Sequence, residues 1–403
     1  MKHVLAMVLA GGRGKRMDIF CDQRPKPVLP FAGKYRVIDI TLNNCVHSQI
    51  EDIAVLVDYQ KSAIIDYLKL WNLPNHRNLE IAVLQPRSGS YTGTSDAVYQ
   101  NLAYLETKGA DTVLILAGDH IYNMDYRDML AFHHEKQADV TVGITRVPLG
   151  EATRFGTLVT TTDGRIKEFV EKSSTPVSDL ASMGIYIFNR EFLMKQLVKD
   201  AHIANSPHDF GYAVLPSIIE QNRVFGYVFK GYWQDIGTVE SYYQTNMQLL
   251  GGQDSFDLNK FDSVLSVNGS ACLEIVNVPG RIVNSLISPG CVIDGYVENS
   301  ILSPGVKIEE KAEVVNSIVM DNTHIKYHSI VDRCILDEDV IIDKFCYLGF
   351  GNASLRRIND ITLVGKVVHL VPENAIGSKS RILSGSRLYN THSRLATPSN
   401  KVS

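Results

Sequence analysis

The sequence contains no run of about 18 apolar residues, the length that a membrane-spanning helix requires. Residues 4–10 are apolar and follow a lysine, so they superficially resemble the start of a signal peptide. That run is very short and leads into the glycine-rich, basic segment 11–16 rather than into a small-residue cleavage site. We therefore expect residues 4–10 to form a core strand, and we expect no contact with a membrane.

Closely spaced cysteine pairs are also missing. The six cysteines show no Cys-x-x-Cys spacing and stand at positions 21, 45, 272, 291, 334 and 346. This distribution favours neither a disulfide framework nor a zinc site, and reduced thiols in a cytoplasmic protein are its simplest explanation. An excess of positive charge is missing too, because 44 Asp and Glu outnumber 40 Lys and Arg. The composition therefore gives no reason to expect a nucleic-acid partner.

The 403 residues, 45% of them hydrophobic, are enough for two or three domains with their own cores. Up to about residue 240, strand-like and helix-like segments alternate, which predicts an α/β fold with a Rossmann-like, mostly parallel mixed sheet. We expect early strands at 4–10, 53–58, 80–84 and 112–117, and helices at 38–48, 59–71 and 94–107. After Asp119 we expect antiparallel or mixed strands at 139–146, 156–161, 166–171 and 183–188, and closing helices at 190–200, 211–221 and 238–250.

The C-terminal part of the sequence repeats itself. Segments of similar composition begin at Asn284, Asn299, Asn316 and Arg333, with spacings of 15, 17 and 17 residues. Repeats of this length with short β-branched runs and turn residues predict a β-solenoid. We therefore expect a catalytic domain over 1–250, a linker over 251–269, a solenoid over 270–385, and a tail over 386–403 that is partly disordered.

The glycine-rich turn after the first strand is the strongest functional signal. Gly11, Gly12 and Gly14 let the backbone approach a ligand closely and direct N–H groups into one concavity. Arg16, and Lys26 on a proline-stiffened turn, add positive charge that suits a polyphosphate. The pattern matches neither the dinucleotide fingerprint nor the P-loop. The alternative is an ordinary glycine turn with two solvated basic residues.

Two carboxylates provide a candidate metal site. Asp119 directly follows an apolar strand, and Asp235 stands in an otherwise apolar and aromatic stretch. Hard oxygen ligands suit Mg²⁺, although either residue alone could be a helix cap or a turn residue. Glu171 and Lys172 end another strand, either as a surface ion pair or as ligands for sugar hydroxyls and a sugar phosphate. Gln85 also follows a strand, and its amide could read an adenine edge.

The segments LAGGRGKR and RPKPVLPF resemble the signature of the sugar-1-phosphate nucleotidyltransferases. Further matches are AGDHIY around Asp119, YWQDIGT around Asp235, FVEK ending at Lys172, YTGTSDA starting at Tyr91, and the short segments FG, SMGIY and HDFG. Two positions depart from the family pattern, since Ser95 replaces Ala and Ser173 replaces Pro. The matches favour the members that use ATP over relatives that use UTP, GTP or dTTP.

The resemblance implies an enzyme that transfers AMP from ATP to α-D-glucose 1-phosphate, with Mg²⁺ as cofactor. It also implies that the solenoid is a left-handed parallel β-helix, and that the protein is an allosteric homotetramer. The catalytic residues would be Arg16, Lys26 and Asp119, with the metal on Asp119 and Asp235. The nucleotide would contact Ala10, Gly11, Gly12, Gly14, Arg16, Lys26, Gln85, Gly93 and Thr94. The sugar phosphate would contact Tyr91, Gly156, Glu171, Lys172, Ser182, Tyr186, Asp209 and Phe210.

Regulation is where the sequence departs most from the family. Many members carry a lysine just before the arginine of the second basic turn, and Gln23 stands there instead. We expect a weakened response to an anionic metabolite effector, with Arg24, Arg356 and Arg357 as the remaining candidate contacts. Three alternatives stay open: a non-catalytic regulatory subunit, a different nucleotide or sugar phosphate, and an acyltransferase that uses His324 and His328. A short tail leaves little room for an acyl-CoA site, so those histidines are better read as surface residues.

Overall fold

The computed structural model describes residues 3–71, 78–251, 256–258, 275–278, 281–350 and 360–388. The chain divides into two compact units. Unit 1 comprises Met1–Phe31, Tyr35–Thr245 and Gly252–Cys272, and unit 2 comprises Ala32–Lys34, Asn246–Gly251 and Leu273–Ser403. Most of the predicted linker, the candidate effector residues Arg356 and Arg357, and residues 389–403 of the predicted tail lie outside the described residues.

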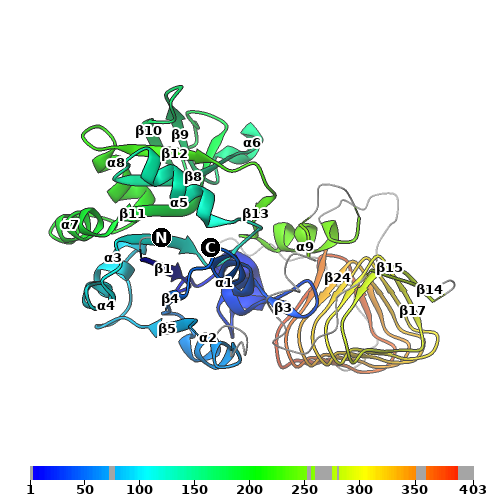
Figure 1. The fold of residues 1–403 in the computed structure, drawn as a ribbon. Coiled ribbons are helices and arrows are strands. Elements are labelled where there is room, and N and C mark those ends of the chain that lie inside the picture. Colours follow the sequence, from blue (N-terminus) through cyan, green and yellow to red (C-terminus); the bar gives the residue numbers. More distant parts are fainter. Residues whose placement is uncertain are drawn as a thin grey trace. The chain divides into compact units, whose positions relative to one another are not determined.

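The sheet of unit 1 starts with four parallel strands, which confirms the predicted parallel arrangement (Figure 1). β1 (Val4–Leu9) lies between β6 (Thr112–Ala117) and β4 (Asp52–Leu56), and β5 (Glu80–Leu84) pairs with β4. Nearly all side chains of β1 and β6 are buried, as expected of central parallel strands. Because the four strands are parallel, their carboxyl ends share one edge of the sheet, where ligands bind in such folds.

Antiparallel strands extend the sheet beyond β6. β11 (Leu180–Asn189) pairs antiparallel with β6 and with β8 (Val140–Arg146), and β12 (Val224–Val228) joins β8 in parallel. The hairpin of β9 (Gly156–Thr160) and β10 (Ile166–Glu171) meets β11 through one residue pair. The sheet is thus mixed, as predicted. Its only strand missing from the prediction is β12.

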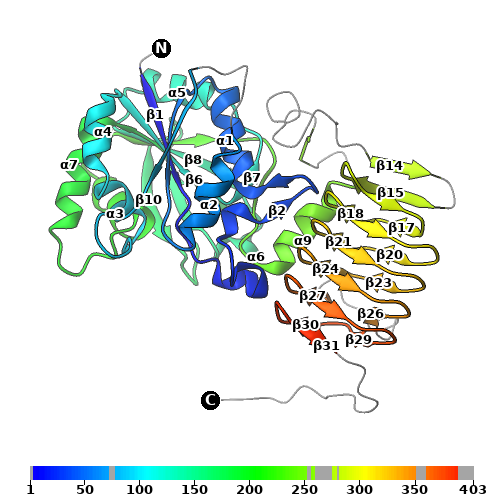
Figure 2. The ribbon, with the colours of Figure 1, turned by 90° about the horizontal axis from the view of Figure 1, so that it is seen from below.

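The helices of the first 250 residues connect these strands, and α3, α4 and α7 lie together in both views (Figures 1 and 2). Two helices, α5 (Tyr126–Glu135) and α6 (Leu149–Ala152), were not predicted. Two of the predicted helices take a different form. The helix predicted over 94–107 is two helices, separated at Asn101, whose side chain donates to the Ala97 carbonyl (2.8 Å) and the Tyr91 hydroxyl (3.0 Å). The helix predicted over 211–221 starts as a π-helix, η3 (Phe210–Val214). The α-helices are α1 (Val37–His47), α2 (Lys61–Leu68), α3 (Thr94–Tyr99), α4 (Leu102–Lys108), α5 (Tyr126–Glu135), α6 (Leu149–Ala152), α7 (Arg190–Ala201), α8 (Leu215–Ile218) and α9 (Val239–Gln248).

A two-stranded ribbon was not predicted, and it has the greatest consequence for function. β7 (His120–Tyr122) pairs antiparallel with β13 (Trp233–Asp235), so that His120 faces Asp235 across the ribbon. Each strand has only three residues, too few to show a β pattern in the sequence. The ribbon brings Asp235 next to Asp119 although they lie 116 positions apart in the chain.

Unit 2 contains the left-handed parallel β-helix that the repeats and the resemblance predicted, and Figure 2 shows its stacked coils. Its strands form three faces. One face holds β17 (Tyr296–Glu298), β20 (Glu313–Val315), β23 (Ile330–Asp332), β26 (Tyr347–Phe350) and β29 (Ala375–Gly377). The next holds β18 (Ile301–Leu302), β21 (Ile318–Val319), β24 (Cys334–Leu336), β27 (Thr362–Val364) and β30 (Arg381–Ile382). The third holds β16 (Val292–Ile293), β19 (Lys307–Ile308), β22 (His324–Ile325), β25 (Ile341–Ile342), β28 (His369–Leu370) and β31 (Arg387–Leu388). Strand β15 (Ile282–Ile287) pairs in parallel with β17 and with β18, the first strands of two of these faces, and β14 (Ile275–Val278) pairs antiparallel with β15.

The repeated Asn-Ser pair has a structural reason in this β-helix. Asn284, Asn299 and Asn316 all have positive φ, between 42° and 48°, at one corner of the coils. Asparagine tolerates this conformation better than most residues. The serines that follow are buried, and the Ser285 hydroxyl accepts the N–H of Ser300, one coil further on, at 3.1 Å. The repeat therefore satisfies corner geometry and a buried hydrogen-bond ladder together.

The two histidines of the acyltransferase alternative have ordinary contacts within the β-helix. His324 Nε2 lies 2.7 Å from Glu309 Oε1. The ring of His328 stacks on Phe345 with 5.5 Å between centroids.

No helix among the residues that the structure describes is long and apolar enough to cross a membrane.

Asp39 ties the first two helices of unit 1 together. Its carboxylate is almost completely buried, and it accepts hydrogen bonds from the Arg36 N–H (2.7 Å), the Tyr67 hydroxyl (2.6 Å) and the Trp71 indole (2.9 Å). Burial raises the pKa of Asp39, and these three hydrogen bonds oppose that effect. Asp39 lines neither cavity described below, which agrees with a structural role.

We predict that Asp39→Ala destabilises unit 1 by roughly 3 kcal/mol, because three donors lose their acceptor in a buried place. Calorimetric unfolding of the full chain measures this as a lower unfolding temperature. Asp66→Ala is the matched control, since that side chain is 71% exposed and pairs only with Lys69 on its own helix among the ion pairs described. Equal unfolding temperatures for the two variants would contradict the structural role.

Candidate active site

Two adjoining cavities lie at the carboxyl edge of the parallel strands. The first has a volume of about 370 Å³ and the second about 300 Å³. They share part of their lining, because Leu9, Thr94, Ala117, Asp119 and Asp209 contribute to both. A ligand in one cavity can therefore reach a ligand in the other beside Asp119.

The first cavity is lined by the glycine-rich turn and the second basic turn. Gly11, Gly12, Gly14 and Lys26 all lie there, with Gly93 and Thr94 from the opposite wall. Gly14 has a φ of 58°, which glycine adopts without strain, and it opens the short 3₁₀ helix η1 (Lys15–Cys21). A second short 3₁₀ helix, η2 (Lys26–Val28), carries the lysine. Six of the nine residues predicted to contact a nucleotide thus line one cavity.

The wall at Gly93 is held by close packing with the 207–208 backbone. A side chain on Gly93 would collide with the carbonyl oxygens of Pro207 and His208. The His208 carbonyl in turn accepts the N–H of Ser95 at 3.0 Å. The Ser95 hydroxyl, at a position where the family has alanine, donates to Asp200 at 2.9 Å. This departure from the family therefore adds a buried contact and leaves the cavity lining unchanged.

The second cavity gathers the residues predicted to bind a sugar phosphate. Seven of the eight line it, and Tyr91 is the exception because it lines the first cavity. Arg16, predicted on the nucleotide side, lines the second cavity. The seven are Gly156, Glu171, Lys172, Ser182, Tyr186, Asp209 and Phe210.

Several of these side chains are already engaged with one another. Asp209 caps η3 by accepting the N–H groups of Gly211 (2.8 Å) and Tyr212 (3.0 Å), and its other oxygen accepts the Thr94 hydroxyl (2.9 Å). Phe210 is 1% exposed and packs on Tyr186 with 5.6 Å between ring centroids. Asp209 and Phe210 thus shape the cavity wall as well as facing its interior.

Glu171 and Lys172 contribute opposite charges to the second cavity. Their side chains lie 3.2 Å apart, with Lys172 half exposed and Glu171 largely covered. Burial raises the pKa of the Glu171 carboxyl, and the ammonium of Lys172 partly opposes that rise. Lys172 has a positive φ of 45°, so the chain turns sharply there and directs the ammonium toward the cavity.

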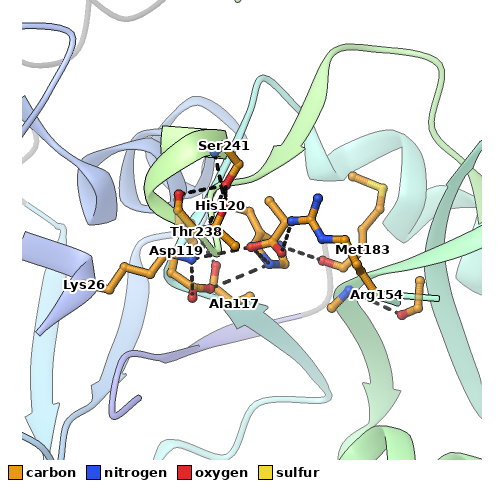
Figure 3. Close-up of polar contacts among 12 residues, drawn as sticks. Lys26, Ala117, Asp119, His120, Arg154, Met183, Thr238 and Ser241 are labelled. Atoms are coloured by element: carbon orange, nitrogen blue, oxygen red, sulfur yellow. Dashed lines mark hydrogen bonds and ion pairs between the residues drawn. The ribbon is translucent and has the colours of Figure 1, made fainter. Parts of the chain in front are cut away.

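The centre of the site is a cluster of charges around Asp119 and Asp235, and Figure 3 shows Asp119 in it with Lys26, His120 and Arg154. Lys26 Nζ lies 2.9 Å from Asp119 Oδ2 and 3.5 Å from Asp235 Oδ1, and the lysine is 4% exposed. One buried ammonium thus faces both carboxylates and offsets their mutual repulsion.

The same cluster keeps Asp119 ionised. Burial would raise the pKa of Asp119, but the charges of Lys26, His120 and Arg16 and the hydrogen bond from Lys26 lower it to about 2. The ordinary value is near 3.8, so the stabilisation from this carboxylate is complete above pH 4 and is lost as the pH falls through about 2. Asp119 is therefore a full negative charge at neutral pH.

Asp119 and Asp235 fit the predicted divalent metal site. Among the residues that the structure describes, no three His, Cys, Asp or Glu side chains form a metal-binding group. A site with two carboxylates suits Mg²⁺, which commonly takes one or two protein carboxylates and completes its shell with phosphate oxygens and water. The buried ammonium of Lys26 between the two residues shows that this position favours a cation.

Among the described residues that line the two cavities, sequence reasoning missed three that are polar or charged. Arg154 lines the second cavity and contacts Asp235 Oδ2 at 3.3 Å. Asp58 lines the first cavity and accepts the Tyr91 N–H at 3.1 Å. His120 lines the second cavity, with Nδ1 3.1 Å from the Met183 carbonyl and Nε2 3.7 Å from Asp119. Asp58 was within reach of prediction, because it follows a strand as Gln85 does.

Three predicted contacts lie apart from the cavity lining. Gln85 is exposed beyond β5, and Ala10 is buried between the lining residues Leu9 and Gly11. Of the candidate effector residues, Arg24 is only 8% exposed. Gln23, next to it, is exposed.

Comparison with known families finds two matches that together span most of the chain. Residues 5–252 match the model of the family described as "Nucleotidyl transferase". Residues 273–371 match the model described as "GlmU-like, C-terminal hexapeptide". The first match covers the region of both cavities, and the second covers the β-helix except for its last strands, β29 to β31.

Curated relatives agree with these matches. A glucose-1-phosphate adenylyltransferase of Thermomicrobium roseum is 43% identical over 399 residues, covering 94% of this chain and 92% of the relative. The enzyme of the same name from Bacillus thuringiensis is 42% identical over 348 residues, covering 84% and 93%. That of Fervidobacterium nodosum is 37% identical over 410 residues, covering 97% and 98%.

Proposed function

Because the chain belongs to the nucleotidyl transferase family, and is similar over nearly its whole length to glucose-1-phosphate adenylyltransferases, we propose that it makes ADP-glucose and pyrophosphate from ATP and α-D-glucose 1-phosphate. The observation that carries this proposal is the pair of adjoining cavities that meet at Asp119. One cavity has the glycine-rich turn suited to a triphosphate, and the other has the charged residues suited to a sugar phosphate. ADP-glucose is the activated donor for α-glucan synthesis.

The reaction is a single in-line displacement. A phosphate oxygen of glucose 1-phosphate attacks the α-phosphorus of ATP, the new P–O bond forms, and pyrophosphate leaves. No general base is required, because the sugar phosphate is already ionised at neutral pH. The protein acts by positioning the two substrates and by offsetting charge.

Each part of the site has a role in this reaction. The turn at residues 11–14 holds the β- and γ-phosphates together with Arg16, which reaches them from the second cavity. Lys26 offsets charge at the α-phosphate, and Lys172 orients the attacking phosphate. Glu171, Asp209 and the neighbouring side chains of the second cavity bind the glucose hydroxyls. Gly93, Thr94 and Tyr91 line the path of the nucleotide, with Gln85 as a candidate contact to its base.

Nucleotidyltransferases generally use divalent metal ions, and we infer that Mg²⁺ is the ion used here. Asp119 and Asp235 would hold it. When bound, it neutralises charge on the reacting phosphates. Lys26, which contacts both carboxylates, then keeps a buried positive charge beside them.

The alternative of a non-catalytic regulatory subunit has less support. Such subunits typically show changes in the basic residues that contact phosphate, whereas Arg16, Lys26 and Lys172 are all present here and line the cavities together with Asp119 and Asp235. Pyrophosphate release by the isolated chain from ATP and glucose 1-phosphate separates the two cases. Parallel assays with other nucleoside triphosphates and sugar 1-phosphates test substrate choice.

We predict that Asp119→Asn lowers kcat roughly 100- to 1,000-fold, because it removes a preorganised charge at the reacting phosphates. Steady-state pyrophosphate release measures the effect. Asp66→Asn, an exposed carboxylate on α2, is the matched control and keeps wild-type turnover. Near-normal turnover of Asp119→Asn would rule out the catalytic role.

We predict that Lys172→Ala raises the KM for glucose 1-phosphate roughly 10- to 100-fold, the value of one charge-assisted hydrogen bond, and leaves the KM for ATP nearly unchanged. Lys167→Ala, on the strand β10 that Lys172 directly follows, is the control, because Lys167 is exposed and lies outside both cavity linings. A change confined to the KM for ATP would contradict the sugar-phosphate role.

For assembly and regulation, we propose a homotetramer with a weakened response to an anionic effector. The weakened effector response is expected because Gln23 is neutral where the family often has a cation, and because Arg24 beside it is only 8% exposed. We predict that Gln23→Lys increases activation by fructose 1,6-bisphosphate, measured as the activity ratio with and without it. Strong activation of the wild-type chain that survives Arg24→Ala would contradict this proposal.

A further inference from the structure

Arg154 is a charged residue of the second cavity to which the reaction above assigns no role. It lies between α6 and β9, and its side chain lines the cavity together with Lys172. We propose that Arg154 binds the phosphate of the sugar 1-phosphate together with Lys172, and that Asp235 holds its guanidinium ready before the substrate binds. This inference rests on the proposed function, which supplies the sugar 1-phosphate as second substrate.

The backbone places Arg154 and Lys172 on the same side of the cavity. Phe155, the residue after Arg154, accepts the Lys172 N–H through its carbonyl at 3.1 Å. The next residues along the two strands, Gly156 and Glu171, are paired in the β9–β10 hairpin. Two cations from adjacent strand ends therefore line one cavity of about 300 Å³.

Arg154 is held where it is without being locked there. Its guanidinium contacts Asp235 Oδ2 at 3.3 Å and Glu151 at 3.6 Å, and it lies 5.3 Å from the ring of Phe155. Its side chain is 28% exposed, whereas that of Asp235 is 11% exposed. Figure 3 shows Arg154 and Lys26 reaching the charge cluster from opposite sides. The long contacts and partial exposure allow the guanidinium to turn toward a phosphate.

The chemistry of a guanidinium favours this ligand. Its planar set of N–H donors matches phosphate in a bidentate manner, which an ammonium cannot do. Lys172 alone offers an ammonium that already pairs with Glu171 at 3.2 Å. A second cation would offset the remaining charge of a doubly charged phosphate. Arg154 lines the same cavity, and the backbone hydrogen bond from Lys172 to Phe155 places its segment beside Lys172. Arg154 is absent from the lining of the first cavity, so the triphosphate is the less suitable partner.

The experiment is calorimetric titration of the full chain with glucose 1-phosphate and, separately, with ATP in the presence of Mg²⁺. We expect Arg154→Met to raise the Kd for glucose 1-phosphate roughly 10- to 100-fold and to leave that for ATP unchanged. Arg154→Lys keeps the charge and should give an intermediate Kd. Arg146→Met is the matched control, because Arg146 is 69% exposed, pairs with Asp179 and lies outside both cavities.

The outcomes separate this inference from the proposed function. An unchanged Kd for glucose 1-phosphate in Arg154→Met, with a normal unfolding temperature, would overturn the inference, as would a loss confined to ATP. If the wild-type chain binds no glucose 1-phosphate, the proposed function fails. Inorganic phosphate then serves as the probe, and loss of its binding in Arg154→Met still supports a phosphate site at this residue.

Discussion

The contact of Lys26 with Asp119 and Asp235 is the interaction on which the rest of the site depends. Two carboxylates brought this close repel one another, and the burial of Asp235 adds a further cost. A buried ammonium at 2.9 and 3.5 Å offsets both effects. The stiff turn that carries Lys26 and the short ribbon that carries Asp235 must therefore both be in place before the site exists.

The β7–β13 ribbon explains how distant segments reach this cluster. Because Asp235 pairs with His120, residues 119 and 235 become neighbours without lying on adjacent strands of the main sheet. Aromatic rings pack next to the cluster. The ring centroids of His120 and Trp233 lie 5.3 Å apart, and those of Trp233 and Phe155 lie 5.2 Å apart. This packing links Asp119 and Asp235 to the wall of the second cavity, which Arg154 and Lys172 also line.

Predictions from the sequence succeeded where a pattern depends on local physics. Strands 80–84, 112–117 and 166–171 have the predicted bounds, because short apolar or β-branched runs bounded by turns leave few alternatives. The predictions were wrong at Asn101, where a side chain ends a helix through contacts outside that helix. They also missed Arg154 and Asp58, whose importance comes from what the fold places beside them.

The sequence by itself determined the parallel sheet, the β-helix repeat and the glycine-rich turn, because each depends on spacing and backbone preference within a few residues. The Asn-Ser repeat is one example, since left-handed corners and buried serines recur at the coil length. Only the tertiary structure decided which residues share a cavity. It placed Arg16 in the lining of the second cavity and Tyr91 in the lining of the first. It also brought Arg154 into an ion pair with Asp235. Such proximities come from long-range strand pairing and charge balance, which no local stretch of sequence records.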